Sequence, residues 1–282
     1  MGEQIVTIHE PDGPIRKGYL KLWKEIFQET KDSKWLIWQL FLRNFKGIYS
    51  QSILGIAWVL IMPLGTLLTF IVLKGTGIFD VGEIKVPYAI YAILGLTFWQ
   101  IFATGIQRST NSLVSAGGML KRIYFPREVL VFSSLGTIIT SFLIQMILVF
   151  LLFVVYSFIP NWHIIFLPLM TIPLLLLTCG LGFIFSLING VIRDLGRLLS
   201  FGLIFLLFIT PIAYEKPDTG VITTLANINP VYYLSVAPRE IALTGNLSDP
   251  FSYFISCAFS IFIFFVCWMS FHLAEPRIIE RL

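Results

Sequence analysis

Long, continuous runs of apolar residues separated by short polar stretches dominate the chain. A membrane-spanning helix needs about 20 mostly apolar residues, because a rise of about 1.5 Å per residue must cross about 30 Å of hydrocarbon. Strands of a membrane barrel would instead alternate apolar and polar positions, which these runs do not. The pattern therefore predicts an all-α membrane protein. Six segments reach the required length, at about 54–73, 86–106, 129–158, 164–192, 198–214 and 251–271.

Two stretches before the first predicted span carry apolar residues at helical spacing. The first covers residues 19–27, and the second begins at Ser33, a suitable N-cap, and continues through Trp35 and Trp38 to Phe45. Tryptophan on one face with Lys and Arg on the other is typical of a helix that lies in the membrane interface. We predict such an interface helix within an N-terminal segment, residues 1–52. A soluble helix packed on a partner protein is the alternative.

The composition supports a membrane protein. Of the 282 residues 56% are hydrophobic and only 13% are charged, whereas a soluble domain carries about 25% charged residues. This excludes an ordinary soluble enzyme and a disordered protein, and three cysteines are too few for a disulfide scaffold. Residues 53–282 are thus predicted to form one six-span transmembrane domain.

The distribution of Lys and Arg predicts the orientation. If the N-terminus is cytoplasmic, four of the 20 basic residues fall outside and the other 16 fall inside. Basic residues concentrate on the cytoplasmic side of membrane proteins. Both termini are therefore expected in the cytoplasm, and the net charge of +4 reflects topology rather than an interaction with nucleic acid. The four outside residues are Lys74, Lys85, Lys216 and Arg239.

Two extramembrane segments are longer than a simple connection needs. The inside loop 107–128 is rich in Ser, Thr and Asn before Gly117 and Gly118, and we expect it to form a short helix that docks on a cytosolic partner. A flexible basic loop is the alternative. The outside segment 215–250 contains four prolines and the pair Tyr232 and Tyr233. It favours short re-entrant helices at the outer mouth, with an ordinary external loop as the alternative.

The sequence lacks the motifs of an enzyme or of an ion-coupled transporter. It contains no phosphate-binding loop, no zinc-protease or nucleophile-elbow motif and no Asp-x-Asp pair. The three histidines lie far apart along the chain, so we expect no metal site and no cofactor. The six spans as drawn contain no charged residue, whereas ion-coupled transporters usually place ionisable groups at mid-membrane. The energy for transport is therefore expected from a separate ATPase.

Several short motifs occur in order along the chain. A basic, Tyr-containing run from Arg43 leads through Leu54 and Gly55 to Trp58, and Pro63-Leu64 follows. The others are Lys121-Arg-Ile-Tyr-Phe-Pro-Arg127, Arg193-Asp-Leu195, Thr210-Pro-Ile-Ala-Tyr214 and Asn229-Pro230. Together they resemble the permease subunit of type 2 ABC exporters, in the branch that exports lipid-linked polysaccharide. That branch includes the permeases for O-antigen, capsule and teichoic acid.

The resemblance implies a dimer of permeases served by a dimer of ABC ATPases, which would bind the ATP and Mg. Membrane lipids and a lipid-linked glycan are the further partners it implies. The residues implied for the interface helix and inner gate are Arg43, Lys46, Tyr49, Leu54, Gly55 and Trp58. Those implied for coupling to the ATPase are Ser109, Ser112, Ser115, Lys121 and Arg122.

A channel between the two permeases is implied mainly along the first and fifth spans. Aromatic rings suit such a channel, because the apolar faces of sugars stack on them without strong specificity. The candidates for lining it are Phe70, Phe201, Phe205, Phe208 and Tyr214, with Tyr232 and Tyr233 at the outer mouth. We therefore expect an inner-membrane permease that exports an O-antigen-like, lipid-linked polysaccharide and is not itself an enzyme. The alternatives are an exporter of teichoic acid, capsule or small lipophilic compounds, and a membrane enzyme of glycan or lipid synthesis.

Overall fold

The computed structural model describes residues 19–49, 53–76, 81–82, 84–120 and 125–279, and every regular element within these ranges is a helix. This confirms the predicted all-α class. Five helices are long and apolar enough to cross a membrane, and they correspond to five of the six predicted spans. They are Gly55–Gly75, Tyr88–Met119, Glu128–Val155, Trp162–Val191 and Pro250–Glu275.

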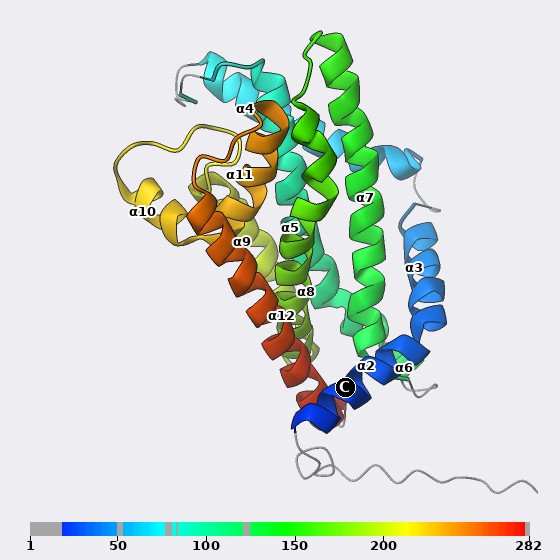
Figure 1. Cartoon of the computed structure of the whole chain (residues 1–282). Helices are drawn as coiled ribbons and strands as arrows, with labels where there is room; N and C mark the ends of the chain where they lie inside the picture. Colours follow the sequence, from blue (N-terminus) through cyan, green and yellow to red (C-terminus); the bar gives the residue numbers. More distant parts are fainter. Residues whose placement is uncertain (1–18, 50–52, 77–80, 83, 121–124, 280–282) are drawn as a thin grey trace, which may run out of the picture.

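Helix α5 (Tyr88–Ser115) occupies the centre of the bundle. It packs extensively on α8 (Leu167–Val191) and α7 (Glu128–Val155), and α12 (Pro250–Ile279) packs on the other side of α8 (Figure 1). Within the most apolar window of each span, 72% of α5 is buried, but only 17% of α4 (Trp58–Gly75). The central helix is thus enclosed by protein, whereas α4 lies at the surface.

Small residues allow the central helices to approach closely. Helices in lipid gain little from the hydrophobic effect, so they associate through close packing at small side chains. A Cβ atom added to Gly182 of α8 would lie 2.5 Å from the Cβ of Ser109, and one added to Gly105 of α5 would lie 2.3 Å from Thr178. At Gly180 the nearest atom would be the backbone Cα of Phe264, at 2.8 Å. Glycine therefore sets the spacing of α5, α8 and α12.

A buried amide joins three helices at one end of the bundle. Asn189, near the end of α8, donates from Nδ2 to the carbonyl of Thr110 at 3.1 Å, and its Oδ1 accepts from the backbone of Gly196 at 3.0 Å. Gly196 lies in the first turn of α9 (Leu195–Ile209). A buried polar side chain is stable when its groups are paired in this way. The start of α9 is thereby tied to α5 and α8.

Helix α5 extends nine residues beyond the end predicted at residue 106. The predicted loop 107–128 is in consequence largely helical, because α5 continues to Ser115 and α6 covers Gly117–Leu120. Residues 107–115 look like a loop because they are polar, but Ser109, Thr110 and Ser112 are buried by neighbouring helices. Tertiary packing therefore outweighs composition in this segment.

Helix α9 is shorter than the predicted span 198–214. Its 15 residues reach about 22 Å, less than the roughly 30 Å of hydrocarbon. The chain continues without helix to Tyr214, whose carbonyl accepts a hydrogen bond from the Tyr91 hydroxyl at 3.2 Å. Gly196 lies beside Asn111 at the other end of α5. The segment from Gly196 to Tyr214 thus runs beside 20 residues of α5, from 111 to 91, or about 30 Å.

The two predicted N-terminal helices are present, as α2 (Tyr19–Asp32) and α3 (Lys34–Tyr49). Figure 1 shows that α2 crosses one end of the bundle, beside the last turns of α12, whereas α3 runs along α7. Leu40 and Phe41 of α3 are buried, and Trp35 and Trp38 are exposed. Helix α3 is therefore apolar on two sides, which explains why it packs along a long helix and does not lie flat across the end.

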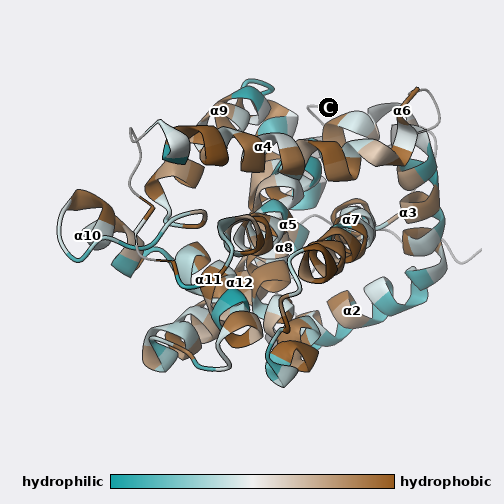
Figure 2. Cartoon of the chain, turned by 90° about the horizontal axis from the view of Figure 1, so that it is seen from above, coloured by the Kyte–Doolittle hydropathy of each residue, from teal (hydrophilic) through white to brown (hydrophobic). Residues whose placement is uncertain are grey.

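We call the end of the bundle that carries α2, the last turns of α5 and α12 and the first turn of α7 the basic end. The opposite end, called the far end, carries α10 (Val221–Ile228) and α11 (Pro230–Leu243). The 3-10 turn η2 (Trp162–Phe166) leads into α8 there, and the backbone of Asn161 donates to the carbonyl of Ala242 at 2.9 Å. Helix α4 runs obliquely across the bundle, unlike the upright α7 (Figures 1 and 2).

Replacing Gly180 tests the close packing of α8 on α12. We expect Gly180→Ala to lower the free energy of unfolding by about 1–3 kcal/mol, because its methyl group meets backbone that cannot move aside. Gly202→Ala in α9 is the matched control, since nothing lies within 4 Å of its position and alanine favours a helix. Thermal unfolding of the two purified variants measures the difference. Equal stability of the two variants would contradict the packing described.

Candidate functional site

A polar cavity of about 710 Å³ opens at the basic end, between α3, α5 and α7. Two arginines, Arg43 of α3 and Arg108 of α5, line it, and the described lining residues include no carboxylate. Hydroxyl and amide groups make up most of the remaining wall. They come from Asn44, Thr104, Gln107, Asn111, Ser112, Ser115, Ser134 and Thr137.

Two donors of this cavity, Arg43 and Thr137, are only partly used within the described part of the protein. Arg43 donates to the sulfur of Met119 at 3.3 Å and to Oδ1 of Asn44 at 3.2 Å, both weak acceptors compared with a carboxylate. Thr137 is 1% exposed, and its hydroxyl has no hydrogen-bond partner among the described residues. Two cations, many neutral donors and no carboxylate suit an anionic group such as a phosphate. We name this cavity the arginine cavity.

The structure brings three of the predicted residues together in the arginine cavity. Arg43 was predicted at the inner gate, and Ser112 and Ser115 for coupling to the ATPase. Ser109 lies one turn away but is fully buried against Gly182, so it presents nothing to a docked protein. The other two coupling residues, Lys121 and Arg122, lie outside the described residues.

The remaining predicted gate residues lie around the start of α4. Lys46 is exposed at the end of α3, and the side chain of Tyr49 lies outside the described residues. Gly55 begins the 3-10 turn η1 (Gly55–Ala57) with φ of +49°, a conformation that side-chain-bearing residues rarely adopt. Leu54 before it and Trp58 after it are nearly half exposed. The Leu-Gly pair thus provides the bend that leads into α4.

The predicted channel residues divide into an exposed set and a buried set. Phe201, Phe205 and Phe208 are exposed along α9, and the rings of Phe201 and Phe205 lie 4.6 Å apart. Phe70 is 0% exposed and packs on Phe208 at 5.7 Å, while Tyr214 is buried and donates its hydroxyl to the carbonyl of Phe208 at 2.6 Å. Phe70 and Tyr214 therefore support the aromatic row from behind and do not line a surface.

The exposed rows of α4 and α9 share one face of the bundle. Figure 2 shows the two helices along the same side, both mainly hydrophobic, and the contact between Phe70 and Phe208 joins them. We call this the α4/α9 face. Its exposed large apolar side chains include Trp58, Ile61, Met62, Leu68, Ile71, Val72, Leu198, Phe201, Ile204, Phe205, Phe208 and Ile209.

The predicted outer-mouth residues Tyr232 and Tyr233 line a pocket of about 340 Å³ at the far end. Arg239 is the main feature that the sequence did not reveal there. It is 3% exposed, lies 3.8 Å above the ring of Tyr91 and donates to the carbonyl of Ile212. A cation held over an aromatic face is favourable when it is shielded from water. Arg239 therefore joins α11, α5 and the segment after α9.

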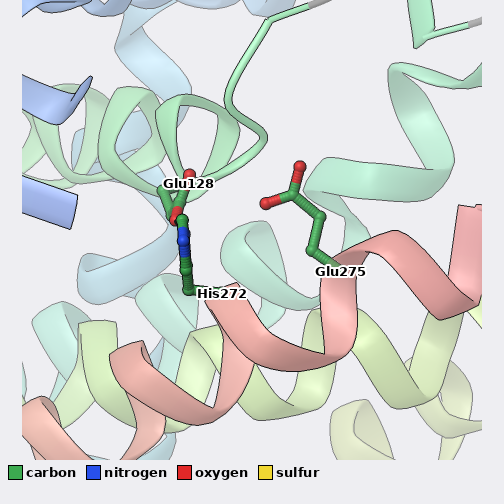
Figure 3. Close-up of side chains that lie close together, drawn as sticks. All are labelled: Glu128, His272 and Glu275. Atoms are coloured by element: carbon green, nitrogen blue, oxygen red, sulfur yellow. The ribbon is translucent and has the colours of Figure 1, made fainter. Parts of the chain in front are cut away.

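Charged side chains at the basic end form a network between α7 and α12 (Figure 3). Nδ1 of His272 lies 2.7 Å from Oε1 of Glu128, and Glu275 forms an ion pair with Arg127. Arg127 ends the motif that begins at Lys121, and Glu128 follows it directly; the sequence assigned no role to either residue. The network ties the start of α7 to the end of α12. Glu128 is the first residue of α7, and His272 and Glu275 lie in the last turns of α12.

Glu128, His272 and Glu275 offer ligand atoms within 4.8 Å of one another. This is the grouping in the described part of the chain that could hold a metal ion. Each of the three residues already has a partner of opposite or complementary character, and Arg127 occupies the position beside Glu275. A buried ion-pair network explains the arrangement without a metal.

Comparison with known proteins agrees with these features. The family model for the ABC-2 type transporter matches residues 36–243. An O-antigen export system permease protein RfbA of Myxococcus xanthus is 25% identical over 234 residues, covering 82% of this chain and 87% of the relative. A protein of the same name from Klebsiella pneumoniae is 30% identical over 217 residues, covering 73% and 79%.

The family match covers the arginine cavity, the α4/α9 face and most of the far-end pocket. Members of this family are transporter components rather than enzymes. Five long apolar helices agree with a multi-pass membrane protein. The chain therefore belongs to the ABC-2 type transporter family, as a permease of the branch that contains the O-antigen exporters.

Proposed function

We propose that this permease exports a lipid-linked polysaccharide across the inner membrane, driven by ATP that a separate ABC ATPase hydrolyses. The arginine cavity is the observation that carries the proposal, because it suits the phosphate groups that join a glycan to its lipid carrier. The names of the similar proteins support O-antigen as the kind of glycan. ATP and Mg belong on the ATPase, since this chain has no phosphate-binding loop.

The proposed topology has six crossings, with both termini in the cytoplasm. The segment from α9 to Tyr214 is the crossing that the five long helices lack, the fifth in chain order, because it runs beside about 30 Å of α5 even though only 15 residues are helical. Sixteen of the 20 basic residues of the sequence then lie on the cytoplasmic side. The far-end helices α10 and α11 are short enough to be re-entrant.

The glycan passes, in this proposal, between two copies of the permease. The α4/α9 face is the least enclosed part of the bundle, and its aromatic row can stack on the apolar faces of sugar rings. A second copy would cover this face and make the path. The glycan would leave past the pocket that Tyr232, Tyr233 and Arg239 line.

The ATPase docks at the basic end in this account, against α6 and the end of α5. Helix α5 lines the arginine cavity at one end, and at the other end its Tyr91 contacts Arg239 and the carbonyl of Tyr214. A push on the basic end of this helix therefore reaches both sites. The Arg127–Glu275 and Glu128–His272 pairs keep α7 and α12 together during such a movement.

Export should depend on the arginines of the cavity. Cells depleted of this permease should retain the lipid-linked glycan inside, and the wild-type gene should restore its appearance at the surface. We expect the Arg43→Gln/Arg108→Gln variant to restore at most about a tenth of export, because each lost charge-assisted bond to phosphate costs about 1.5–3 kcal/mol. Lys34→Gln is the matched control, since Lys34 is exposed on α3 but does not line the cavity.

Surface labelling of the glycan and its amount in inner membranes measure both predictions. If depletion leaves the glycan at the surface, the proposed function is wrong. If depletion blocks export but the double variant restores it as well as Lys34→Gln does, the function stands and the role of the arginine cavity is wrong.

The ion pair between α7 and α12 should show energetic coupling. Arg127→Gln leaves Glu275 buried beside no guanidinium, so we expect it to lower the free energy of unfolding by about 3 kcal/mol. Arg127→Gln/Glu275→Gln should cost less than the sum of the two single changes, by about 1 kcal/mol or more. Unfolding of the four proteins measures the coupling, and strictly additive effects would contradict the network.

A further inference from the structure

A second, apolar cavity lies under α2 at the basic end, where this helix crosses the ends of α7 and α12 (Figure 1). Its volume is about 740 Å³. Phe132 of α7 and Phe264, Phe265 and Trp268 of α12 form its floor, and Lys24 and Lys31 of α2 stand at its rim. We call it the α2 groove. It combines an aromatic interior with a cationic border.

Trp268, which lines the groove, has an indole N–H without a hydrogen-bond acceptor among the described residues. Its side chain is 3% exposed, and its Nε1 has no hydrogen-bond partner among the described residues. A buried donor without an acceptor loses its bond to water and gains nothing in return. The ring itself is fixed, because Phe27 packs on it edge-on at 5.0 Å and Phe132 at 5.3 Å. An oxygen atom of a ligand in the groove would supply the missing acceptor.

The rim of the groove selects for negative charge. Lys24 and Lys31 are seven residues apart on α2, about two helical turns, so both face the groove. Among the described lining residues there is no carboxylate. The nearby Asp32 accepts from Nε2 of Gln28 at 3.1 Å. The two ammonium groups are therefore available to an anion.

The groove also lies at the depth of lipid headgroups. Trp268 precedes Glu275, an ion-paired residue in the last turns of α12, by seven residues. The cavity thus extends from the boundary of the hydrocarbon to the polar level at which Trp and Lys side chains gather. A phospholipid presents an acyl chain and a charged phosphate at these two levels.

We propose that the α2 groove binds one anionic phospholipid, whose acyl chain lies on the aromatic floor and whose phosphate lies between Lys24 and Lys31. A lipid ester or phosphate oxygen accepts a hydrogen bond from the indole N–H of Trp268. The bound lipid fills the space between α2 and α12 and joins the two helices. It lies one helical turn from His272, and so beside the network that ties α12 to α7.

This site goes beyond the proposed export function. The family match covers residues 36–243, and of the floor and rim only Phe132 falls within it. Residues near the two ends of the chain, outside the matched range, therefore form most of the proposed lipid site. The arginine cavity lies on the other side of α7 and is a different site.

The full-length protein, purified in detergent and titrated with phosphatidylglycerol or phosphatidylcholine, tests the proposal by native mass spectrometry. We expect one phosphatidylglycerol to bind at least about tenfold more tightly than phosphatidylcholine. Lys24→Gln/Lys31→Gln should weaken phosphatidylglycerol binding by about thirtyfold, at about fivefold per lysine, and remove the preference. Lys21→Gln/Lys34→Gln is the matched control, because these exposed lysines do not line the groove.

Trp268→Phe keeps the aromatic floor and removes the N–H. This change should weaken the binding of both lipids by about fivefold and leave the preference between them unchanged. The proposal is overturned if both lysine pairs have the same effect, or if the two lipids bind equally to the wild type. It is also overturned if removing residues 1–18 strengthens lipid binding, because the chain's own N-terminus would then be the occupant. None of these results depends on whether the protein exports a glycan.

Discussion

The close approach of α5 and α8 is the constraint on which the rest of the structure depends. Lipid offers these apolar helices no hydrophobic reason to pair, so they associate where glycine opposes a small side chain, at Gly182 with Ser109 and at Gly105 with Thr178. Asn189 adds a hydrogen bond at the end of the same contact. The pair then supports α7, α12 and α11, and it leaves α4 and α9 at the surface, where a second copy can cover them.

The central position of α5 gives the proposed mechanism its physical basis. One helix lines the arginine cavity at the basic end and holds Arg239 through Tyr91 at the far end. Because α5 is enclosed on most sides, a displacement at one end is transmitted along it rather than absorbed by a loop. The ion pairs between α7 and α12 provide a second rigid connection at the end where the ATPase is proposed to dock.

The sequence predicted the features that depend on local apolar pattern. The third and fourth spans were predicted to within a few residues, since their ends coincide with the ends of apolar runs. The end of α5 was missed, because its polar Ser109 and Ser112 are buried by tertiary contacts. His272 and Glu128 are 144 residues apart, so no spacing rule brings them together. Phe70 and Tyr214 are buried and Phe205 is exposed, and the sequence does not predict this difference because it depends on how the folded chain orients each side chain.

Photocrosslinking on the α4/α9 face tests the central claim most directly. Phe205 of α9 is 53% exposed and Phe150 of α7 is 50% exposed, so the two positions are matched in residue and exposure. Each is replaced by p-benzoylphenylalanine in cells that make the glycan, and the products are identified after illumination. The account predicts that position 205 crosslinks to a second permease or to the glycan, while position 150 crosslinks to lipid alone. Crosslinks from position 205 to lipid alone would contradict a path between two copies.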